Sequence, residues 1–533
     1  MAARAAPALP EGFRQAIERG VQSGVYQSVA IGWIDGKDRG TWLFGQAQAD
    51  STFEIGAATE VFTGLLLAQA ALEGKLRLQM PIRELLPADF PFADPALGAV
   101  TLEALATHHA GLPALPPNLL PHNADDPYAD YSEQDLRAFL ANYRLTSSSS
   151  GYVYSTLDAG LLGYLLGRAY ATNYTKLLND NILLPLGLQH TGLDDGPALL
   201  AGHARGEAAA HWHFSALAGS AGLRSSTNDL LDFLQRNLRP EESPLRAALL
   251  LARQSRARAP TEEIGLGWNI VEVGAGEVGA GGQTWPLVWR ASGTAGFSTF
   301  IGFRTDRQQA LVLLGNTDTG LSALGLALLK SDAPPSLPPA PMPPPTAAQL
   351  GAYPGLYQVR SGVEVTVRQH DGRLSAQLSG QPAALLHADG EDVFDAGADG
   401  FGISFQREAG KVTNLLLNRE GVNFLAQRLS ERAPHVSRAP IAVAAKSLLD
   451  YAGDYRLDAN TLARIAVHTD TLSLQLTGRA SLPLLAFAKD RFAADDASCE
   501  LVFARDVAGK IAALRIAFAG SERDATRVHW VTP

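Results

Sequence analysis

The stretch from Phe53 to Gly74 constrains the fold of this chain most strongly. It opens with residues typical of the end of a strand, and Gly56 then marks a tight turn. A helical run with several leucines continues to Leu72, and the glycine at position 74 is a common stop signal for a helix. The sequence therefore predicts a strand, a tight turn and a helix in direct succession.

Other elements are predicted on either side of this stretch. Apolar residues recur at helical spacing over residues 10–24, which predicts an opening amphipathic helix. Residues 29–33 and 41–44 are predicted strands, joined by a turn over residues 35–40 that is rich in glycine and aspartate. A further apolar helix is predicted over residues 161–167.

Length and charge narrow the class of protein. A chain of 533 residues is long enough for roughly two to four domains. Hydrophobic residues make up 46% and charged residues 18%, which is typical of a globular chain rather than a disordered one. The net charge is −10 and there is no basic run, so no nucleic acid is expected as the main partner.

No metal and no cofactor are predicted. Cys499 is the only cysteine, so no intrachain disulfide can form and a cysteine-based metal site is not expected. The two close histidine pairs, His108 with His109 and His211 with His213, are only weak signals for zinc.

The sequence gives two alternatives for the compartment. No apolar run reaches the roughly 18 residues that a membrane span needs. The N-terminus lacks the apolar core of a signal peptide, so a cytoplasmic location is expected for the chain as written. A periplasmic location is the alternative, if this is a mature form from which a signal was removed and to which Met1 was added.

The last part of the chain contains an internal repeat. Tyr353-Pro-Gly-Leu-Tyr357 recurs as Tyr451-Ala-Gly-Asp-Tyr455, and other matches follow at the same spacing of 98 positions. Apolar and polar residues alternate within each copy, which predicts two small antiparallel sheets. Closing each sheet into a barrel would protect its edge strands.

Composition also predicts where the domains end. Proline-rich residues follow position 332 and indicate a stiff spacer. The predicted organisation lists five parts: a first domain at 1–332, a linker at 333–348, a β-barrel repeat at 349–430, a linker at 431–446, and a second β-barrel repeat at 447–533.

Five motifs follow one another in the first domain: Gly74-Lys-Leu-Arg-Leu-Gln-Met-Pro81, Thr101-Leu-Glu-Ala-Leu-Ala-Thr-His-His-Ala-Gly-Leu-Pro113, Pro185-Leu-Gly-Leu-Gln-His-Thr-Gly192, Ala221-Gly-Leu-Arg-Ser-Ser-Thr-Asn-Asp-Leu230 and Gly265-Leu-Gly-Trp268. In this order they resemble the serine β-lactamase and penicillin-binding-protein superfamily, in the branch of class C β-lactamases, D-Ala-D-Ala carboxypeptidases and esterases. The resemblance implies an α/β (α+β) domain with an antiparallel sheet flanked by helices. The two repeats resemble the lipocalin-like β-barrel modules that often follow such domains.

The first catalytic motif of this family is altered at both of its reactive positions. The family carries Ser-x-x-Lys in the turn at the start of the helix. Here Ala57 stands at the serine position and Glu60 at the lysine position. A nucleophilic hydrolase needs an activatable oxygen or sulfur with a base beside it, and alanine has no such atom. Glutamate also reverses the charge of the lysine.

The second and third motifs are altered as well. The family's Tyr-Ser-Asn corresponds to a segment in which Tyr154 is kept and Thr156 replaces asparagine. The family's His-x-Gly corresponds to a segment that begins with Arg290 and places Ser292 at the glycine position, two residues before Thr294. The resemblance implies that Thr156, Arg290, Ser292 and Thr294 are ligand-binding candidates.

Two roles remain open for each catalytic candidate. Glu60 is either a stabilising acid in the first turn of a helix, worth about 0.3–1 kcal/mol, or a general acid–base group. As a stabilising acid it is expected to pair with Arg290 across the cleft, because an unpaired buried charge is costly. Tyr154 either packs in the cleft or donates a proton. His108 and His109 are expected to pack in a structural turn.

The altered motifs lead to three functional hypotheses. The favoured one is a non-hydrolytic pseudoenzyme or ligand-binding protein, with a small molecule in the cleft and with the barrels contacting a partner or forming oligomers. The alternative is a repurposed lyase, cyclase or isomerase that uses Glu60 and Tyr154. The least favoured is a hydrolase with a displaced nucleophile, for which Ser155, Ser292 and Thr294 supply hydroxyls.

Overall fold

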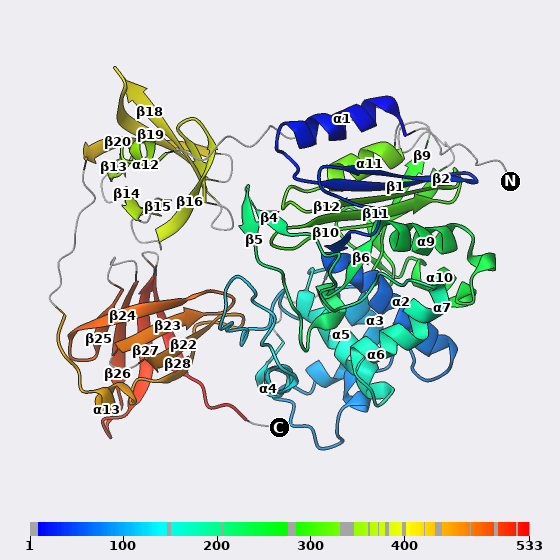
Figure 1. Ribbon diagram of the computed structural model, residues 1–533. Helices are drawn as coiled ribbons and strands as arrows, with labels where there is room; N and C mark the ends of the chain where they lie inside the picture. The colour runs from blue at the N-terminus through cyan, green and yellow to red at the C-terminus, as the bar shows by residue number, and fades with distance from the viewer. Residues whose placement is uncertain are drawn as a thin grey trace. The chain divides into compact units, whose positions relative to one another are not determined.

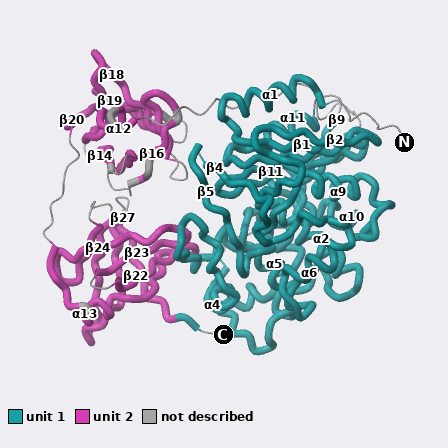
Figure 2. The backbone as a smooth tube through the Cα atoms, viewed as in Figure 1, with its two compact units in different colours: residues 1–340, 530–533 teal, residues 341–529 magenta. Residues whose placement is uncertain are grey.

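The computed structural model describes residues 9–531, apart from residues 146–150, 205, 275–283, 331–345, 361–362, 371–372, 379–382, 397–400, 420–421, 432–439, 469–470, 495–498 and 519–520. The chain divides into two compact units, which Figure 2 colours separately: Met1–Ala340 with Trp530–Pro533, and Pro341–His529. Most of the first predicted linker and half of the second lie outside the described residues. The predicted domain boundaries therefore stay predictions.

The first unit is built on an eight-stranded antiparallel sheet. Its strand order is β2 (Asp38–Phe44), β1 (Val29–Asp35), β12 (Gln309–Gly315), β11 (Ser298–Arg304), β10 (Thr284–Gly293), β9 (Asn269–Gly274), β8 (Glu263–Ile264) and β7 (Ala257–Arg258). The predicted hairpin at its start is confirmed, but the predicted turn over residues 35–40 is too long. Asp35 pairs with Asp38, because Gly36 takes a φ of +59° and allows a tighter turn.

Helices cover both faces of this sheet (Figure 1). One face packs against α1 (Glu11–Gln22) and α11 (Ser322–Lys330), and their buried residues share one core with β1, β11 and β12. The other face packs against α9 (Thr227–Leu238) and belongs to the larger core, which also contains α2 (Thr59–Leu72) and α5 (Thr156–Ala169). The predicted sheet flanked by helices is confirmed.

Shorter elements complete this unit. The remaining helices are α3 (Leu102–Ala106), α4 (Glu133–Asn142), α6 (Tyr174–Leu178), α7 (Leu184–Leu186), α8 (Ala218–Ala221) and α10 (Arg246–Ala252). Two small antiparallel pairs stand apart from the main sheet: β3 (Thr52–Glu54) with β6 (Arg224–Ser226), and β4 (Gly202–Ala204) with β5 (Glu207–Ala209). None of the described helices is long and apolar enough to cross a membrane.

The succession predicted from Phe53 to Gly74 is confirmed. Strand β3 leads into a short 3-10 turn over Gly56–Ala58, and α2 follows and ends at Leu72. All but one of the residues of α2 from Thr59 to Ala70 are buried, so this helix lies inside the core rather than on its surface. At Gly64 an added Cβ would lie 2.2 Å from the carbonyl oxygen of Leu266, so only glycine allows this close approach.

The second unit contains two closed antiparallel barrels, as predicted. The first is formed by β13 (Gly355–Arg360), β14 (Val363–His370), β15 (Arg373–Leu378), β16 (Ala383–Gly390), β17 (Val393–Asp395), β18 (Phe401–Glu408), β19 (Lys411–Arg419) and β20 (Val422–Ser430). The second is formed by β21 (Gly453–Arg456), β22 (Leu462–His468), β23 (Thr471–Leu476), β24 (Ser481–Ala488), β25 (Arg491–Ala493), β26 (Cys499–Arg505), β27 (Ile511–Phe518) and β28 (Ser521–Arg527). One short helix precedes each barrel, α12 (Ala347–Leu350) and α13 (Ala445–Leu448). Their likeness to lipocalins stays a prediction.

The sequence repeat is also a repeat of side-chain contacts. The hydroxyl of Tyr353 donates a 2.8 Å hydrogen bond to Asp392 in the first barrel, and Tyr451 donates a bond of the same length to Asp490 in the second. Both aspartates take a left-handed backbone conformation, with φ of +59° and +60°. The two copies therefore fold by the same local interactions.

Candidate functional site

The turn before α2 forms one wall of a pocket. Its volume is about 310 Å³ and its lining residues are Ala57, Tyr154, Asn269, Trp289, Arg290, Ala291, Ser292 and Gly293. The backbone N–H of Ala57 points at β10, where it donates a 2.5 Å hydrogen bond to Oγ of Ser292. A Cβ added at Gly56 would lie 2.3 Å from the same oxygen, so the turn and the strand touch here.

Glu60 lies one helical turn beyond Ala57 and is only 3% exposed. Three side chains from three different segments hold its carboxylate. The hydroxyl of Tyr154 donates to Oε1 at 2.9 Å, and Nε2 of His108 donates to Oε2 at 3.0 Å. Arg290 forms an ion pair with Oε2. The Glu60–Arg290 contact expected from the sequence is present, and both carboxylate oxygens have hydrogen-bond donors.

Arg290 is held on several sides. It lies on β10 with its side chain toward the helical core, and it is 4% exposed. Besides Glu60, its guanidinium donates to Oδ1 of Asn269 at 2.9 Å and to the carbonyl oxygen of Ala57 at 3.4 Å. The guanidinium carbon is 5.4 Å from the centre of the Tyr154 ring, close enough for a cation–π contact. These contacts leave Arg290 little freedom to turn toward a ligand.

The buried ion pair is charged at neutral pH. Burial acts to raise the pKa of Glu60, but the charge of Arg290 and the interactions with His108 and Tyr154 outweigh it, so the pKa is lowered. Burial acts to lower the pKa of Arg290, and the charge of Glu60 reverses this to a net increase. Burial and the neighbouring Glu60 raise the pKa of Tyr154 far above its ordinary value. The pair therefore has no net charge, and the phenol stays protonated.

His108 is a member of this network that the sequence reasoning missed. The backbone N–H of Ser155 donates to Nδ1 of His108 at 3.3 Å, so the proton of the ring lies on Nε2 and is donated to Glu60. Asp158 lies behind it, with Oδ2 4.0 Å from the same Nδ1, and burial raises the pKa of this aspartate well above its usual range. The available signal was the position of His108 within one of the five ordered motifs.

The other predicted residues divide into two groups. Ser292 lines the pocket with Tyr154 and Arg290. Thr156 and Thr294 are not among the lining residues: Thr156 begins α5 beside Tyr154, and the buried hydroxyl of Thr294 has no hydrogen-bond partner among the described residues. A role for these side chains in ligand binding stays a prediction.

The histidines at positions 211 and 213 contact carboxylates. His213 lies between two of them, with Nδ1 2.7 Å from Asp126 and Nε2 2.9 Å from Asp195. Partial burial acts to lower the pKa of His213, but the two aspartates outweigh this and raise it. His211 binds the buried Glu54 at 2.9 Å. In the described part of the chain, no three His, Cys, Asp or Glu side chains are grouped to hold a metal ion.

Comparison with known proteins finds a matching family model and several relatives. A family model described as Beta-lactamase matches residues 13–331. A β-lactamase of Escherichia coli (strain K12) is 25% identical over 295 residues, which cover 50% of this chain and 75% of that protein. A β-lactamase of Pseudomonas fluorescens is 25% identical over 298 residues, with 50% and 80% covered. The D-alanyl-D-alanine-carboxypeptidase/endopeptidase AmpH of E. coli (strain K12) is 24% identical over 322 residues, with 55% and 81% covered.

Proposed function

We propose that this chain, which belongs to the β-lactamase family, binds a small molecule in the pocket beside Ala57 and does not cleave it. A hydrolase of the serine type attacks its substrate with an activated oxygen, and the methyl group of Ala57 supplies none. The volume of the pocket lies at the lower end of the range for small-molecule sites.

The main support for this proposal is that both carboxylate oxygens of Glu60 already have partners within the protein. A general base needs an accessible lone pair and a pKa near the working pH. Both oxygens of Glu60 accept hydrogen bonds from protein side chains, the residue is 3% exposed, and its pKa is lowered. These properties favour a stabilising role for the Glu60–Arg290 pair over proton transfer to a ligand.

The electrostatics of the pocket favour an uncharged ligand. Two buried charges beside it, Glu60 and Arg290, neutralise each other. The N–H of Ala57, which is a hydrogen-bond donor at the pocket wall, is already bonded to Ser292. A charged ligand would lose hydration without finding a counter-charge, whereas a neutral polar molecule loses less.

A repurposed acid–base enzyme remains the second candidate, because Tyr154 connects the pocket to Glu60. Its ring lines the pocket and its hydroxyl donates to the carboxylate, so a proton could pass between them. The raised pKa of Tyr154 weakens it as an acid. A displaced nucleophile has less support: the Ser292 hydroxyl contacts backbone groups of Ala57 and Gly293, and no base among the described residues.

Native mass spectrometry of the gently purified full chain tests the proposal. We expect a non-covalent small molecule that dissociates unchanged when the protein is denatured. Ser292→Phe, which fills the pocket, should remove it, whereas Thr294→Val, on a neighbouring residue outside the lining, should retain it. A molecule that survives Ser292→Phe would place the binding elsewhere and contradict the proposal. Conversion of the molecule by the wild type but not by Tyr154→Phe would favour the acid–base enzyme.

A further inference from the structure

A second hollow lies in the wall of the first barrel, where two neighbouring strands are bulged. Strand β20 pairs with β13 through Leu356 with Ser430 and Tyr357 with Arg428, which leaves Leu429 as an extra residue. A bulge leaves its extra residue unpaired and is common beside binding sites.

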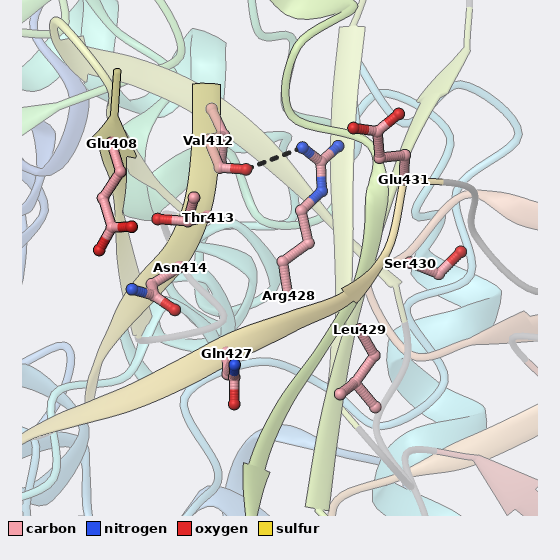
Figure 3. A pocket seen from close by; sticks show the side chains of 9 residues that line it. All are labelled: Glu408, Val412, Thr413, Asn414, Gln427, Arg428, Leu429, Ser430 and Glu431. Carbon is pink, nitrogen blue, oxygen red and sulfur yellow. Dashed lines mark hydrogen bonds between the residues drawn. The ribbon is translucent and has the colours of Figure 1, made fainter. Parts of the chain in front are cut away.

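The neighbouring strand β19 is bulged in the same region. It pairs with β18 through Gln406 with Asn414 and Arg407 with Val412, so Thr413 is the extra residue there. The two bulges adjoin a hollow of about 390 Å³, which Figure 3 shows from close by. This volume suits a small ligand.

Polar side chains dominate the lining of this hollow. Carboxylates, amides and hydroxyls line it, together with one guanidinium, one valine and one exposed leucine: Glu408, Glu431, Asn414, Gln427, Thr413, Ser430, Arg428, Val412 and Leu429. The side chains come from the adjacent strands β18, β19 and β20, and from Glu431, which directly follows β20. The hollow therefore offers many donors and acceptors within one small volume.

Arg428 is fixed by the barrel and sets one side of the hollow. Its guanidinium donates to the carbonyl oxygens of Val412 at 3.0 Å, Ala352 at 3.1 Å and Pro354 at 2.5 Å. It also lies 5.6 Å from the centre of the Tyr357 ring. Both terminal nitrogens are used by backbone carbonyls, and Nε is buried without a partner among the described residues, so Arg428 is an anchor for the barrel rather than a binding group for an anion.

The second barrel provides an internal comparison. Arg527 stacks on Tyr455 at 6.0 Å, as Arg428 stacks on Tyr357, so the anchoring arginine is repeated. The lining is not repeated. Three polar side chains of the first barrel are replaced by smaller or apolar ones at the matching positions of the second: Thr413, Asn414 and Gln427 by Ala512, Ala513 and Thr526. The barrel fold therefore does not require these polar groups, and another role must explain them.

We propose that this hollow binds a short neutral saccharide. Sugar hydroxyls both donate and accept hydrogen bonds, so they match a lining of carboxylates, amides and hydroxyls. Two carboxylates, Glu408 and Glu431, disfavour an anion, and the guanidinium of Arg428 disfavours a cation. Leu429 is 51% exposed and offers an apolar surface for the C–H face of a sugar ring. The site is separate from the pocket beside Ala57 and does not depend on the function proposed for it.

Isothermal titration of the full chain with glucose, N-acetylglucosamine, maltose and cellobiose tests the site. At least one of these saccharides should bind. The triple variant Thr413→Ala, Asn414→Ala, Gln427→Thr gives the first barrel the lining of the second, so its fold should be kept. It should weaken binding about tenfold or more, because several hydrogen bonds are lost. The matched control Ala512→Ser in the second barrel should leave the affinity unchanged.

Three outcomes would overturn the proposal. The first is the absence of binding for all four saccharides. The second is saccharide binding that survives the triple variant, since the sugar would then occupy another part of the chain. The third is binding of citrate or spermidine at this site in place of a sugar, which would reject the ligand class. Circular dichroism melting curves of each variant establish that any loss of binding is not a loss of folding.

Discussion

At the scale of single residues, the buried charges of Glu60 and Arg290 depend on each other. Removing an ion from water is costly, and only a close partner and hydrogen bonds compensate for that cost. Glu60 has Arg290, His108 and Tyr154 as partners, and Arg290 also uses Asn269. A change at either charge therefore leaves the other one buried without a counter-charge.

A double-mutant cycle measures this dependence. Glu60→Gln or Arg290→Met alone should lower the free energy of unfolding by about 3–5 kcal/mol, because each strands the opposite charge. The double variant should lose clearly less than the sum of the two, and denaturant unfolding measures the difference. A coupling energy near zero would show that the two charges are solvated separately.

The same network predicts what happens when a serine is introduced. Ala57→Ser alone should not hydrolyse a chromogenic ester or nitrocefin above the wild-type background. The new hydroxyl would lie beside Glu60, whose carboxylate already contacts Tyr154, His108 and Arg290. The backbone N–H of residue 57 would still be bonded to Ser292. Adding Glu60→Lys should not suffice, since the lysine would face the buried Arg290.

A third change should relieve that repulsion. The triple variant Ala57→Ser, Glu60→Lys, Arg290→His places the residues of the family's motifs at all three positions, and weak ester hydrolysis is expected only there. Rates of ester hydrolysis, measured in parallel on the single, double and triple variants at matched protein concentrations, test whether only the triple variant is active. Hydrolysis by the single variant would count against the assignment of Glu60 as a stabilising acid.

The sequence predicted part of this site. The approach of Glu60 to Arg290 followed from two altered motifs that face each other in the family fold. The role of His108 was missed, because a histidine in a turn gives no sign of which side chain it will contact. Asn269 was missed for the same reason: its contact with Arg290 depends on the pairing of β9 with β10, which a sequence pattern does not contain.

At the scale of elements, His213 connects two loops, because its side chain contacts Asp126 in one loop and Asp195 in the other. His213 lies between Asp126 and Asp195, and both ring nitrogens must carry protons to donate to both carboxylates. Asp195 is also paired with Arg224 at 2.8 Å, at the start of β6. The charge of His213 therefore joins the loop around Asp126 to the loop around Asp195.

This arrangement predicts a pH dependence with a defined sign. The folded pKa of His213 is raised above its ordinary value of 6.5, so its contribution is fully present below about pH 6.5 and is lost as the pH rises through the folded pKa. Because the ring is about half exposed, the contribution should be only about 0.2–1 kcal/mol. His213→Gln should flatten this part of the stability profile.

Unfolding curves recorded between pH 6 and pH 9 for wild type and His213→Gln compare the two profiles. His122→Gln is a suitable control, because His122 is an exposed histidine that faces a single aspartate, Asp130. If the wild type and His213→Gln lose stability in parallel over this range, the bridge between the two loops does not depend on the charge of the ring.

Elements were predicted with different success. The succession of β3, a turn and α2 was predicted correctly, because Gly56 marks the turn and Gly74 follows the end of the helix. The hairpin β1–β2 was placed correctly, but its turn was predicted too long. Three residues assigned to that turn, Asp38, Arg39 and Gly40, pair with β1 instead. Polar residues at the beginning of a strand give the same sequence pattern as a loop, so the pattern alone could not locate the start of β2.

At the scale of the whole molecule, the duplicated barrels show what a sequence repeat can establish. A spacing of 98 positions predicted two similar modules, and both form closed eight-stranded barrels with equivalent tyrosine–aspartate contacts. The bulge between β18 and β19 recurs between β26 and β27, where Ala512 is the extra residue. The repeat did not predict the polar hollow, because its lining depends on a few side chains that differ between the copies. Similar scaffolds thus carry different surfaces.

We propose that this member of the β-lactamase family uses its pocket for binding without covalent chemistry. Intact-mass spectrometry of the full chain tests it most directly, after incubation with a fluorophosphonate and, separately, with a penicillin. The account predicts an unchanged protein mass with both reagents, whereas positive controls treated in parallel gain mass: a serine esterase keeps the phosphonyl adduct, and a slowly deacylating penicillin-binding protein keeps the penicilloyl adduct. A stoichiometric adduct that peptide mapping assigns to any serine between residues 50 and 300 would contradict the account.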